Sequence, residues 1–267
     1  MNGARLYGRY VAASVRAQMQ YPASFVMMTM TQFAVTFVEF IGIWALFQRF
    51  GQIKGWTFGE VALFYAVINI SFAIAETISR GFDVFGPEFV KTGNFDRLLL
   101  RPRRAALQLL GYEFRLMRLG RMAQGVVVMV IAANFVRIGW SVPAAALLLV
   151  TVAGGVALFL GILVLQATLS FWTIESLEVA NTLTYGGVEA AQYPLDIYAR
   201  WFRDFLIFVV PLGCVAYFPV VRLLGHADPL GTPVWIADTS PLFGFLFLAA
   251  SFGLWRLGVR HYASTGS

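Results

Sequence analysis

Glu39 is the side chain best placed to do chemistry, because it is the only charged residue in the apolar stretch 25–47. A carboxylate at the middle of a membrane-spanning helix costs at least about 2.5 kcal/mol, so it must face protein or water or else hold a proton. In that position it can accept a proton, bind a cation or line the path of a transported molecule. The alternative is a structural hydrogen bond to Thr36 or to a neighbouring helix.

The remaining polar residues form none of the common catalytic or nucleotide-binding patterns. The two histidines, His226 and His261, fall on opposite sides of the membrane by the topology predicted below, and the single cysteine, Cys214, lies inside an apolar run. The sequence contains no HExxH, no GxSxG and no GxxxxGK[ST] P-loop. We therefore expect a protein that is not an enzyme and that binds no metal or cofactor of its own.

The composition indicates a protein embedded in a membrane. Of the 267 residues, 59% are apolar and only 13% are charged, whereas a soluble domain has roughly 25% charged residues. A chain so poor in charge cannot cover a water-facing surface. The net charge of +6 does not indicate nucleic-acid binding, because basic residues beside membrane spans are expected for orientation alone.

Six stretches are long and apolar enough to cross a membrane as helices, which takes ~20 residues. They cover residues 25–47, 58–78, 119–136, 143–172, 205–221 and 241–255. None shows the period-two alternation of a barrel strand. The predicted fold is an all-α membrane protein in which residues 1–267 form a single transmembrane domain.

Two features of these stretches predict local contacts. Gly154 and Gly161 in the fourth stretch allow close helix packing, within the chain in preference to packing against a second copy. Glu76, near the end of the second stretch, is expected at the membrane interface beside Arg80, one helical turn later.

The basic residues predict the orientation in the membrane. With the N-terminus in the cytoplasm, 16 of the 20 lysines and arginines fall on the inner side, Arg200 and Arg203 among them. Such a bias is typical of cytoplasmic loops. The four basic residues that fall outside are Arg49, Lys54, Arg137 and Arg222. Both termini are therefore expected in the cytoplasm.

The first 22 residues have the pattern of an amphipathic helix that lies along the membrane surface. Arg5, Arg9 and Arg16 fall within about 40° of one another on a helical wheel. Such a helix directs its arginines toward lipid headgroups before the chain enters the membrane at Tyr21-Pro22. A disordered basic tail is the alternative.

The loop between the second and third stretches contains FGPEFVKTG, which predicts a short helix. Pro87 suits the first helical position, Glu88 suits the positive end of the helix dipole, and Gly93 follows the helix end. Phe85, Phe89 and Val90 give this helix an apolar side. That side needs the membrane surface or another protein as its partner.

A second helical piece is expected from Asp96, as the N-cap, up to Pro102. It belongs to GNFDRLLLRP, residues 93–102, which resembles the G-x-hydrophobic-D-x-x-L-x-R-P stretch after the second span of type-2 ABC exporter permeases. The segment 193–225 is similar to a tyrosine-proline and Y-hydrophobic-P pattern of a poorly characterised bacterial branch of that superfamily. The six-span layout matches across nearly the whole chain.

The resemblance implies that the loop after the second span carries a coupling helix, which binds a groove of a separate ATP-binding subunit. ATP and Mg²⁺ would be used by that subunit, and closure of two such subunits would rock the spans between inward- and outward-facing states. The loop arginines would serve topology alone, or would also pair with acidic groups of the ATPase or with anionic lipid. Carried onto this sequence, the coupling residues would be Phe85, Pro87, Glu88, Phe89, Val90, Phe95 and Asp96.

The resemblance also implies export from a bacterial plasma membrane by two permeases together. Six spans form half of a translocation pathway, so a second copy or a paralogue is expected. The cargo would be a lipid, a glycan or an amphipathic small molecule. The main alternative is an ion-coupled secondary transporter that works without an ATPase. Against it stand the lack of an internal repeat and the presence of only one acid at the middle of a span.

Overall fold

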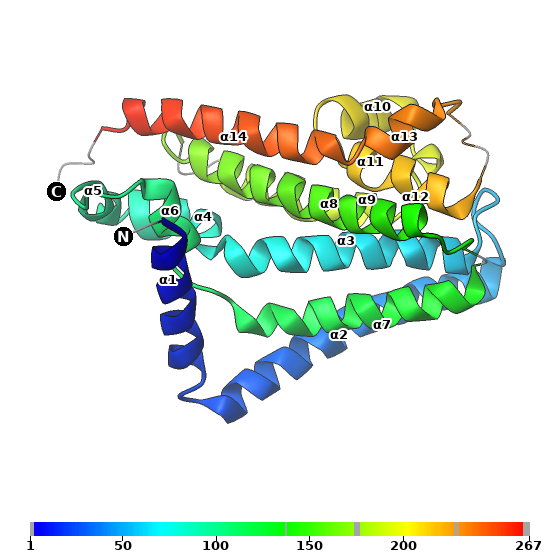
Figure 1. Cartoon of the computed structure of the whole chain (residues 1–267), viewed down its shortest axis with the longest axis horizontal. Coiled ribbons are helices and arrows are strands. Elements are labelled where there is room, and N and C mark those ends of the chain that lie inside the picture. The colour runs from blue at the N-terminus through cyan, green and yellow to red at the C-terminus, as the bar shows by residue number, and fades with distance from the viewer. Residues whose placement is uncertain (1–2, 137, 174–176, 227, 229, 264–267) are drawn as a thin grey trace.

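The computed structural model describes residues 3–136, 138–173, 177–226, 228 and 230–263. Long helices lie side by side along the molecule, and short helices close both ends (Figure 1). We call the end that carries Gly3 and Tyr262 the terminal end, and the other the opposite end. The described residues form helices and loops without a named β-strand, so the predicted all-α class is confirmed.

Six helices run between the two ends: α2 (Pro22–Phe50), α3 (Phe58–Ile78), α7 (Leu119–Phe135), α8 (Val142–Leu169), α9 (Leu177–Ala191) and α14 (Leu242–His261). The terminal end carries α1 (Gly3–Gln18), α4 (Arg80–Asp83), the π-helix η1 (Phe85–Val90), α5 (Asn94–Leu99), α6 (Ala105–Leu110) and the 3₁₀-helix η2 (Leu116–Arg118). The remaining helices are the 3₁₀-helix η3 (Leu195–Ile197), α10 (Arg200–Phe208), α11 (Leu212–Val215), α12 (Tyr217–Leu224) and α13 (Val234–Thr239).

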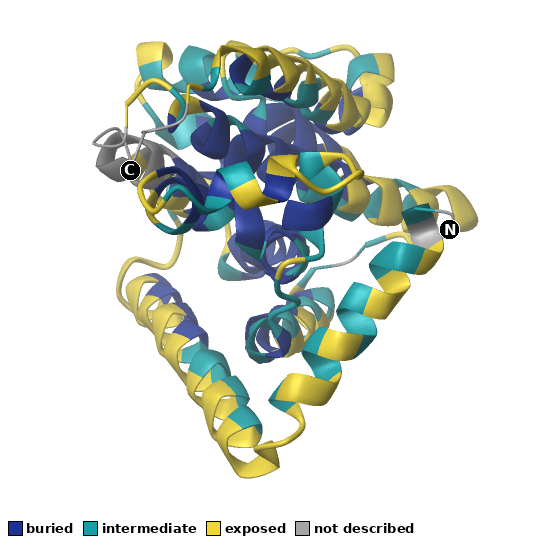
Figure 2. Cartoon of the chain, turned by 90° about the vertical axis from the view of Figure 1, so that its left-hand side faces the viewer, coloured by how far each residue is buried: buried dark blue, intermediate teal, exposed yellow. Residues whose placement is uncertain are grey.

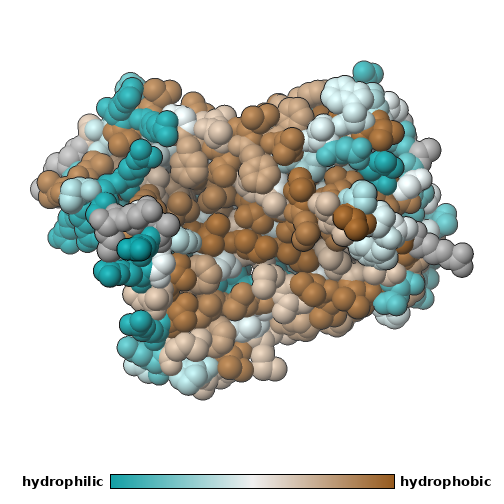
Figure 3. All heavy atoms as spheres, viewed as in Figure 1, coloured by the Kyte–Doolittle hydropathy of each residue, from teal (hydrophilic) through white to brown (hydrophobic). Residues whose placement is uncertain are grey.

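Five of the described helices are long and apolar enough to cross a membrane: α2, α3, α7 together with η2, α8 and α14. They coincide with five of the six predicted stretches. Figure 3 shows the corresponding surface, a broad apolar band between two ends that carry most of the hydrophilic residues. The structure is that of a membrane protein.

Helix α3 forms the centre of the bundle, and most of its length is buried (Figure 2). Thr57 and Glu60 begin it as a capping box, in which the Thr57 backbone N–H donates to the Glu60 carboxylate at 2.8 Å. Helices α7 and α8 pack against α3. Helix α2, by contrast, stays largely exposed outside its contact with α7 (Figure 2).

Helices α8 and α14 cross where glycines remove the side chains. A Cβ atom on Gly154 would collide with the Pro241 carbonyl, and one on Gly244 would collide with the Gly154 carbonyl. A Cβ atom on Gly161 would lie 2.8 Å from the Phe247 ring. The predicted packing of Gly154 and Gly161 within the chain is therefore confirmed.

The predicted fifth span, residues 205–221, is wrong as a single crossing. Helix α10 and the α11–α12 segment that follows it are bent by 72° with respect to each other. Before α10, the Trp56 indole donates to the Asp196 carboxylate at 3.0 Å. After α12, His226 contacts Glu60 at the same end of α3. The chain therefore enters from the opposite end and returns to it, which makes α10–α12 a re-entrant hairpin.

Helix α9 makes the crossing instead. The chain leaves α8 at the terminal end, where Phe171 lies 5.1 Å from the Phe85 ring, and it reaches the opposite end at Asp196. The 15 residues of α9 span roughly 22 Å at 1.5 Å per residue. A crossing therefore lies between the stretches 143–172 and 205–221, where the sequence predicted none.

This correction moves Arg200 and Arg203 to the opposite end. With them moved, 14 of the 20 basic residues remain on the predicted cytoplasmic side. The cytoplasmic location of the terminal end stays a prediction from this charge bias. The start of α1 and the end of α14 both lie there (Figure 1).

Helix α1 lies across the terminal end, at a steep angle to the long helices (Figure 1). Its arginines Arg5, Arg9 and Arg16 are exposed, as the amphipathic pattern predicts. Two hydrogen bonds fix its second half to the bundle. The Phe114 backbone N–H donates to Ser14 Oγ at 2.9 Å, and the Leu116 N–H donates to Gln18 Oε1 at 3.1 Å. The segment is a packed helix, which excludes a disordered tail over residues 3–18.

Candidate functional site

The connection between α3 and α7, residues 79–118, folds into a small helical unit that we call the α3–α7 connection. Helix α4 packs closely on α6, because a Cβ atom on Gly81 would collide with the Leu109 carbonyl. Gly93 adopts a left-handed conformation with φ of 69° and separates η1 from α5. The predicted stop at Gly93 is thus confirmed, although η1 begins at Phe85, two residues before the predicted start at Pro87.

An aromatic cluster holds this connection against α14. Phe85 lies at the centre, with ring-centroid distances of 4.9 Å to Phe95, 5.1 Å to Phe171 and 5.0 Å to Trp255. The rings meet edge to face, an arrangement that stabilises aromatic pairs beyond the area they bury. The apolar side of the short helix therefore has a partner within the chain, in place of the membrane surface or another protein.

The predicted coupling residues divide into a buried and an accessible group. Phe85, Phe89, Val90 and Phe95 are buried, whereas Pro87 is exposed, and Glu88 and Asp96 are partly exposed. Only the second group can touch a partner directly. The coupling role of all seven stays a prediction.

Glu88 is held in place by Tyr112. The Tyr112 hydroxyl donates a hydrogen bond to the Glu88 carboxylate at 2.8 Å. This bond raises the pKa of the Tyr112 hydroxyl above its ordinary value, and burial of the hydroxyl adds a smaller effect in the same direction. The Glu88 backbone carbonyl accepts from Asn94 Nδ2 at 3.1 Å. The accessible side of η1 is therefore fixed by hydrogen bonds as well as by packing.

Asp96 does not cap its helix. Helix α5 begins at Asn94, so the predicted N-cap at Asp96 is wrong, and Asp96 lies in the first turn instead. It contacts Tyr262, just beyond the end of α14. The pKa of the Tyr262 hydroxyl is raised first by burial and then by the Asp96 carboxylate. Asp96 thus adds to the link between the connection and α14.

A second group of polar side chains lies within the bundle, and the sequence did not predict it. Arg121 of α7 is only 7% exposed. Its Nε–H donates to Asn69 Oδ1 at 2.7 Å, and its guanidinium lies 4.9 Å from the Phe72 ring centroid. Arg118 lies 2.8 Å from Glu76, which is also 7% exposed. Charges this deep are tolerated because each has a partner.

The prediction that Glu76 reaches the interface beside Arg80 is wrong. Arg80 pairs with Asp83, and Glu76 faces α7. The signal in the sequence was the helical spacing of Tyr65, Asn69 and Glu76, which places all three on one face of α3. The Tyr65 hydroxyl on that face donates to the Thr36 carbonyl of α2 at 2.8 Å.

Glu39 is exposed near the middle of α2. The structural hydrogen bond to Thr36 is not formed, because Thr36 Oγ1 donates to the carbonyls of Gln32 and Phe33 at 3.0 and 3.1 Å. Glu189 of α9 is exposed as well. Two of the crossing helices thus carry an exposed acidic side chain.

A comparison with protein-family models identifies the chain. The model described as "ABC-2 family transporter protein" matches residues 33–266. The chain belongs to the ABC-2 transporter family. No curated protein and no solved structure matches it.

In the part of the chain that the structure describes, no three His, Cys, Asp or Glu side chains come together to hold a metal ion. The ABC-2 permeases are membrane transport components, and the α3–α7 connection is the part of this chain that resembles their coupling segment.

Proposed function

We propose that this chain is the permease subunit of an ATP-driven exporter, which couples ATP hydrolysis by a separate ATP-binding subunit to the export of a lipid, a glycan or an amphipathic small molecule. Membership of the ABC-2 family supports a permease that works with an ATP-binding subunit. The lack of a P-loop in the sequence agrees with an ATPase on another chain, which would bind the ATP and Mg²⁺. The terminal end would lie in the cytoplasm of a bacterial cell, and the chain in its plasma membrane.

The observation that carries the proposal is the way η1 is mounted at the terminal end. Phe85 is buried against Trp255 of α14. The accessible side of η1 presents Pro87 and Glu88, followed by Lys91. A short helix anchored on one side and open on the other is suited to receive a partner at the end of the bundle. The ATP-binding subunit would contact this open side.

A second permease would cover the open side of the bundle. Glu39 and Glu189 are exposed on the crossing helices α2 and α9, and a carboxylate facing lipid at mid-membrane costs about 2.5 kcal/mol or more. A second copy or a paralogue against this side would remove both side chains from lipid. Glu39 would then line the path of the exported molecule between the two permeases.

Copurification from the native membrane tests the proposal. The tagged chain, extracted in mild detergent, should bring down a P-loop ATPase and a second permease. Glu88→Arg and Lys91→Glu should release the ATPase, whereas Asp204→Arg at the opposite end is the matched control and should retain it. Recovery of the chain alone, with transport that continues without ATP, would instead establish an ion-coupled secondary transporter.

A further inference from the structure

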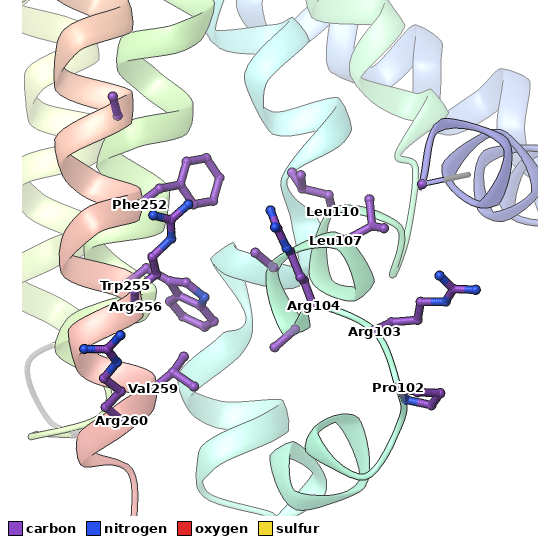
Figure 4. A pocket seen from close by; sticks show the side chains of 14 residues that line it. Pro102, Arg103, Arg104, Leu107, Leu110, Phe252, Trp255, Arg256, Val259 and Arg260 are labelled. Atoms are coloured by element: carbon purple, nitrogen blue, oxygen red, sulfur yellow. The ribbon is translucent and has the colours of Figure 1, made fainter. Parts of the chain in front are cut away.

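A cleft of about 1280 Å³ opens at the terminal end between α14 and α6 (Figure 4). Its walls are apolar on both sides. Phe252 and Trp255 line it from α14, and Leu107 and Leu110 line it from α6 (Figure 4). The cleft thus separates a membrane-crossing helix from the α3–α7 connection.

The rim of the cleft is strongly basic. Arg256 and Arg260 reach it from α14, and Arg104 extends into it from the start of α6 (Figure 4). The lining contains no acidic residue. These three arginines take part in none of the ion pairs of the described residues. Arg103 also belongs to the lining. Guanidinium groups gathered around one opening favour an anion, and arginine binds phosphate well through two parallel hydrogen bonds.

The cleft also extends along α14 toward the centre of the bundle. Its lining runs from Arg260 up to Ala249, eleven residues earlier in the same helix. At 1.5 Å per residue this is roughly 16 Å, about half of the ~30 Å hydrocarbon thickness of a bilayer. A soluble protein subunit cannot reach Ala249 at that depth, whereas an acyl chain can.

We propose that this cleft binds an anionic phospholipid from the leaflet at the terminal end. The phosphate lies among Arg104, Arg256 and Arg260, and an acyl chain lies along Phe252 toward Ala249. The positive charges of the arginines favour an anionic headgroup, and the apolar walls of the cleft favour an acyl chain. The site requires only that the chain crosses the membrane, so it does not depend on coupling to an ATPase.

Binding of defined lipids to the purified full-length chain tests this proposal. The probes are dioctanoyl-phosphatidylglycerol, dioctanoyl-phosphatidylcholine and inorganic phosphate, each titrated against delipidated protein in detergent and followed by native mass spectrometry. The anionic lipid should bind more tightly than the zwitterionic one, and phosphate alone should not compete with it at similar concentrations. Equal binding of the two lipids, or equal competition by phosphate, would overturn the proposal.

Paired variants locate the site. A basic residue near an anionic headgroup contributes about five-fold in affinity, so R104Q/R256Q should weaken phosphatidylglycerol binding roughly 25-fold. R97Q/R101Q removes two exposed arginines of the same connection that do not line the cleft, and it should change binding little. Equal losses in both double variants would show that the lipid responds only to diffuse surface charge.

A third variant tests the tail. Ala249→Trp fills the deep part of the cleft without changing the charge, so it should weaken binding of the lipid while its melting temperature stays near that of the wild type. Unchanged lipid binding in this variant would place the acyl chain elsewhere and refute the proposed pose. If R104Q/R256Q kept its lipid but lost an ATPase in copurification, the cleft would be a protein-docking surface instead.

Discussion

The crossing of α8 and α14 gives the sharpest test of the structure. Gly154→Ala places a methyl group 3.0 Å from the carbonyl carbon of Pro241, closer still to its oxygen, and 3.1 Å from its Cβ atom. These atoms belong to backbone and to a proline ring, so they cannot rotate away, and the two helices must separate. Overpacking of this kind costs typically 1–3 kcal/mol. Gly253→Ala in the middle of α14 meets no atom within 4 Å, so it serves as a matched control.

The control separates packing from helix propensity. Alanine is favoured over glycine inside a helix by about 1 kcal/mol, and this gain applies to both variants. Gly253→Ala should therefore be neutral or more stable than the wild type, and Gly154→Ala should fall below Gly253→Ala by about 2 kcal/mol, the middle of the overpacking range. At roughly 2–4 °C per kcal/mol, thermal unfolding in detergent should show a gap of ~4–8 °C. Equal melting temperatures in the two variants would refute the close crossing.

Three further substitutions test the polar sites. Glu76→Gln should cost about 3–5 kcal/mol, because it leaves the buried Arg121 and the partly buried Arg118 without their carboxylate. Glu113→Gln, at a 43% exposed side chain, should cost less than about 1 kcal/mol. Equal losses in urea or SDS titrations would contradict the buried pair. Glu39→Gln should leave the melting temperature unchanged, since no hydrogen bond is lost, while it slows export; an unchanged transport rate would remove Glu39 from the pathway. The Tyr112 hydroxyl donates to Glu88 only while it is protonated, so the bond is present below the ordinary tyrosine pKa and is lost as the pH rises through the raised value. Glu88→Gln should therefore lower the Tyr112 pKa toward its ordinary value in a difference titration of tyrosinate absorbance against Tyr112→Phe, and an unchanged pKa would show that the two residues do not touch.

The sequence was sufficient for the parts of the fold that depend on hydrophobic length. The ends of α3, Phe58–Ile78, coincide with the predicted stretch because Thr57 and Glu60 cap its start and Ser79 and Arg80 follow its end. The left-handed turn at Gly93 and the amphipathic α1 were likewise predicted, since both depend on local residue types. In these elements the local residue types are enough to predict the backbone conformation.

The re-entrant hairpin could not be predicted from apolar length. Residues 205–221 contain enough apolar side chains for one crossing, and hydropathy does not record whether a chain passes through the membrane or bends within it. Pro211 lies between the two bent parts, but proline also occurs inside straight spans. Helix α9 was missed because Glu189 and paired glycines dilute its apolar character. The hairpin is held at the opposite end by polar contacts such as that between Asp196 and Trp56. Because these residues are far apart in the sequence, their pairing is recognised only in the three-dimensional structure.

The aromatic contacts of Phe85 have a consequence for how displacement passes through the molecule. Helix α14 is bound at one end to η1 through Trp255 and at the other to α8, where Gly154 meets Pro241. Its 20 residues make a single helix of roughly 30 Å. A small displacement of η1 is therefore transmitted to Pro241 through one continuous helix, without an intervening loop. Helix α14 also contacts α11 of the re-entrant hairpin, so a force applied to η1 at one end of the molecule acts along the axis of α14 toward the hairpin at the other end.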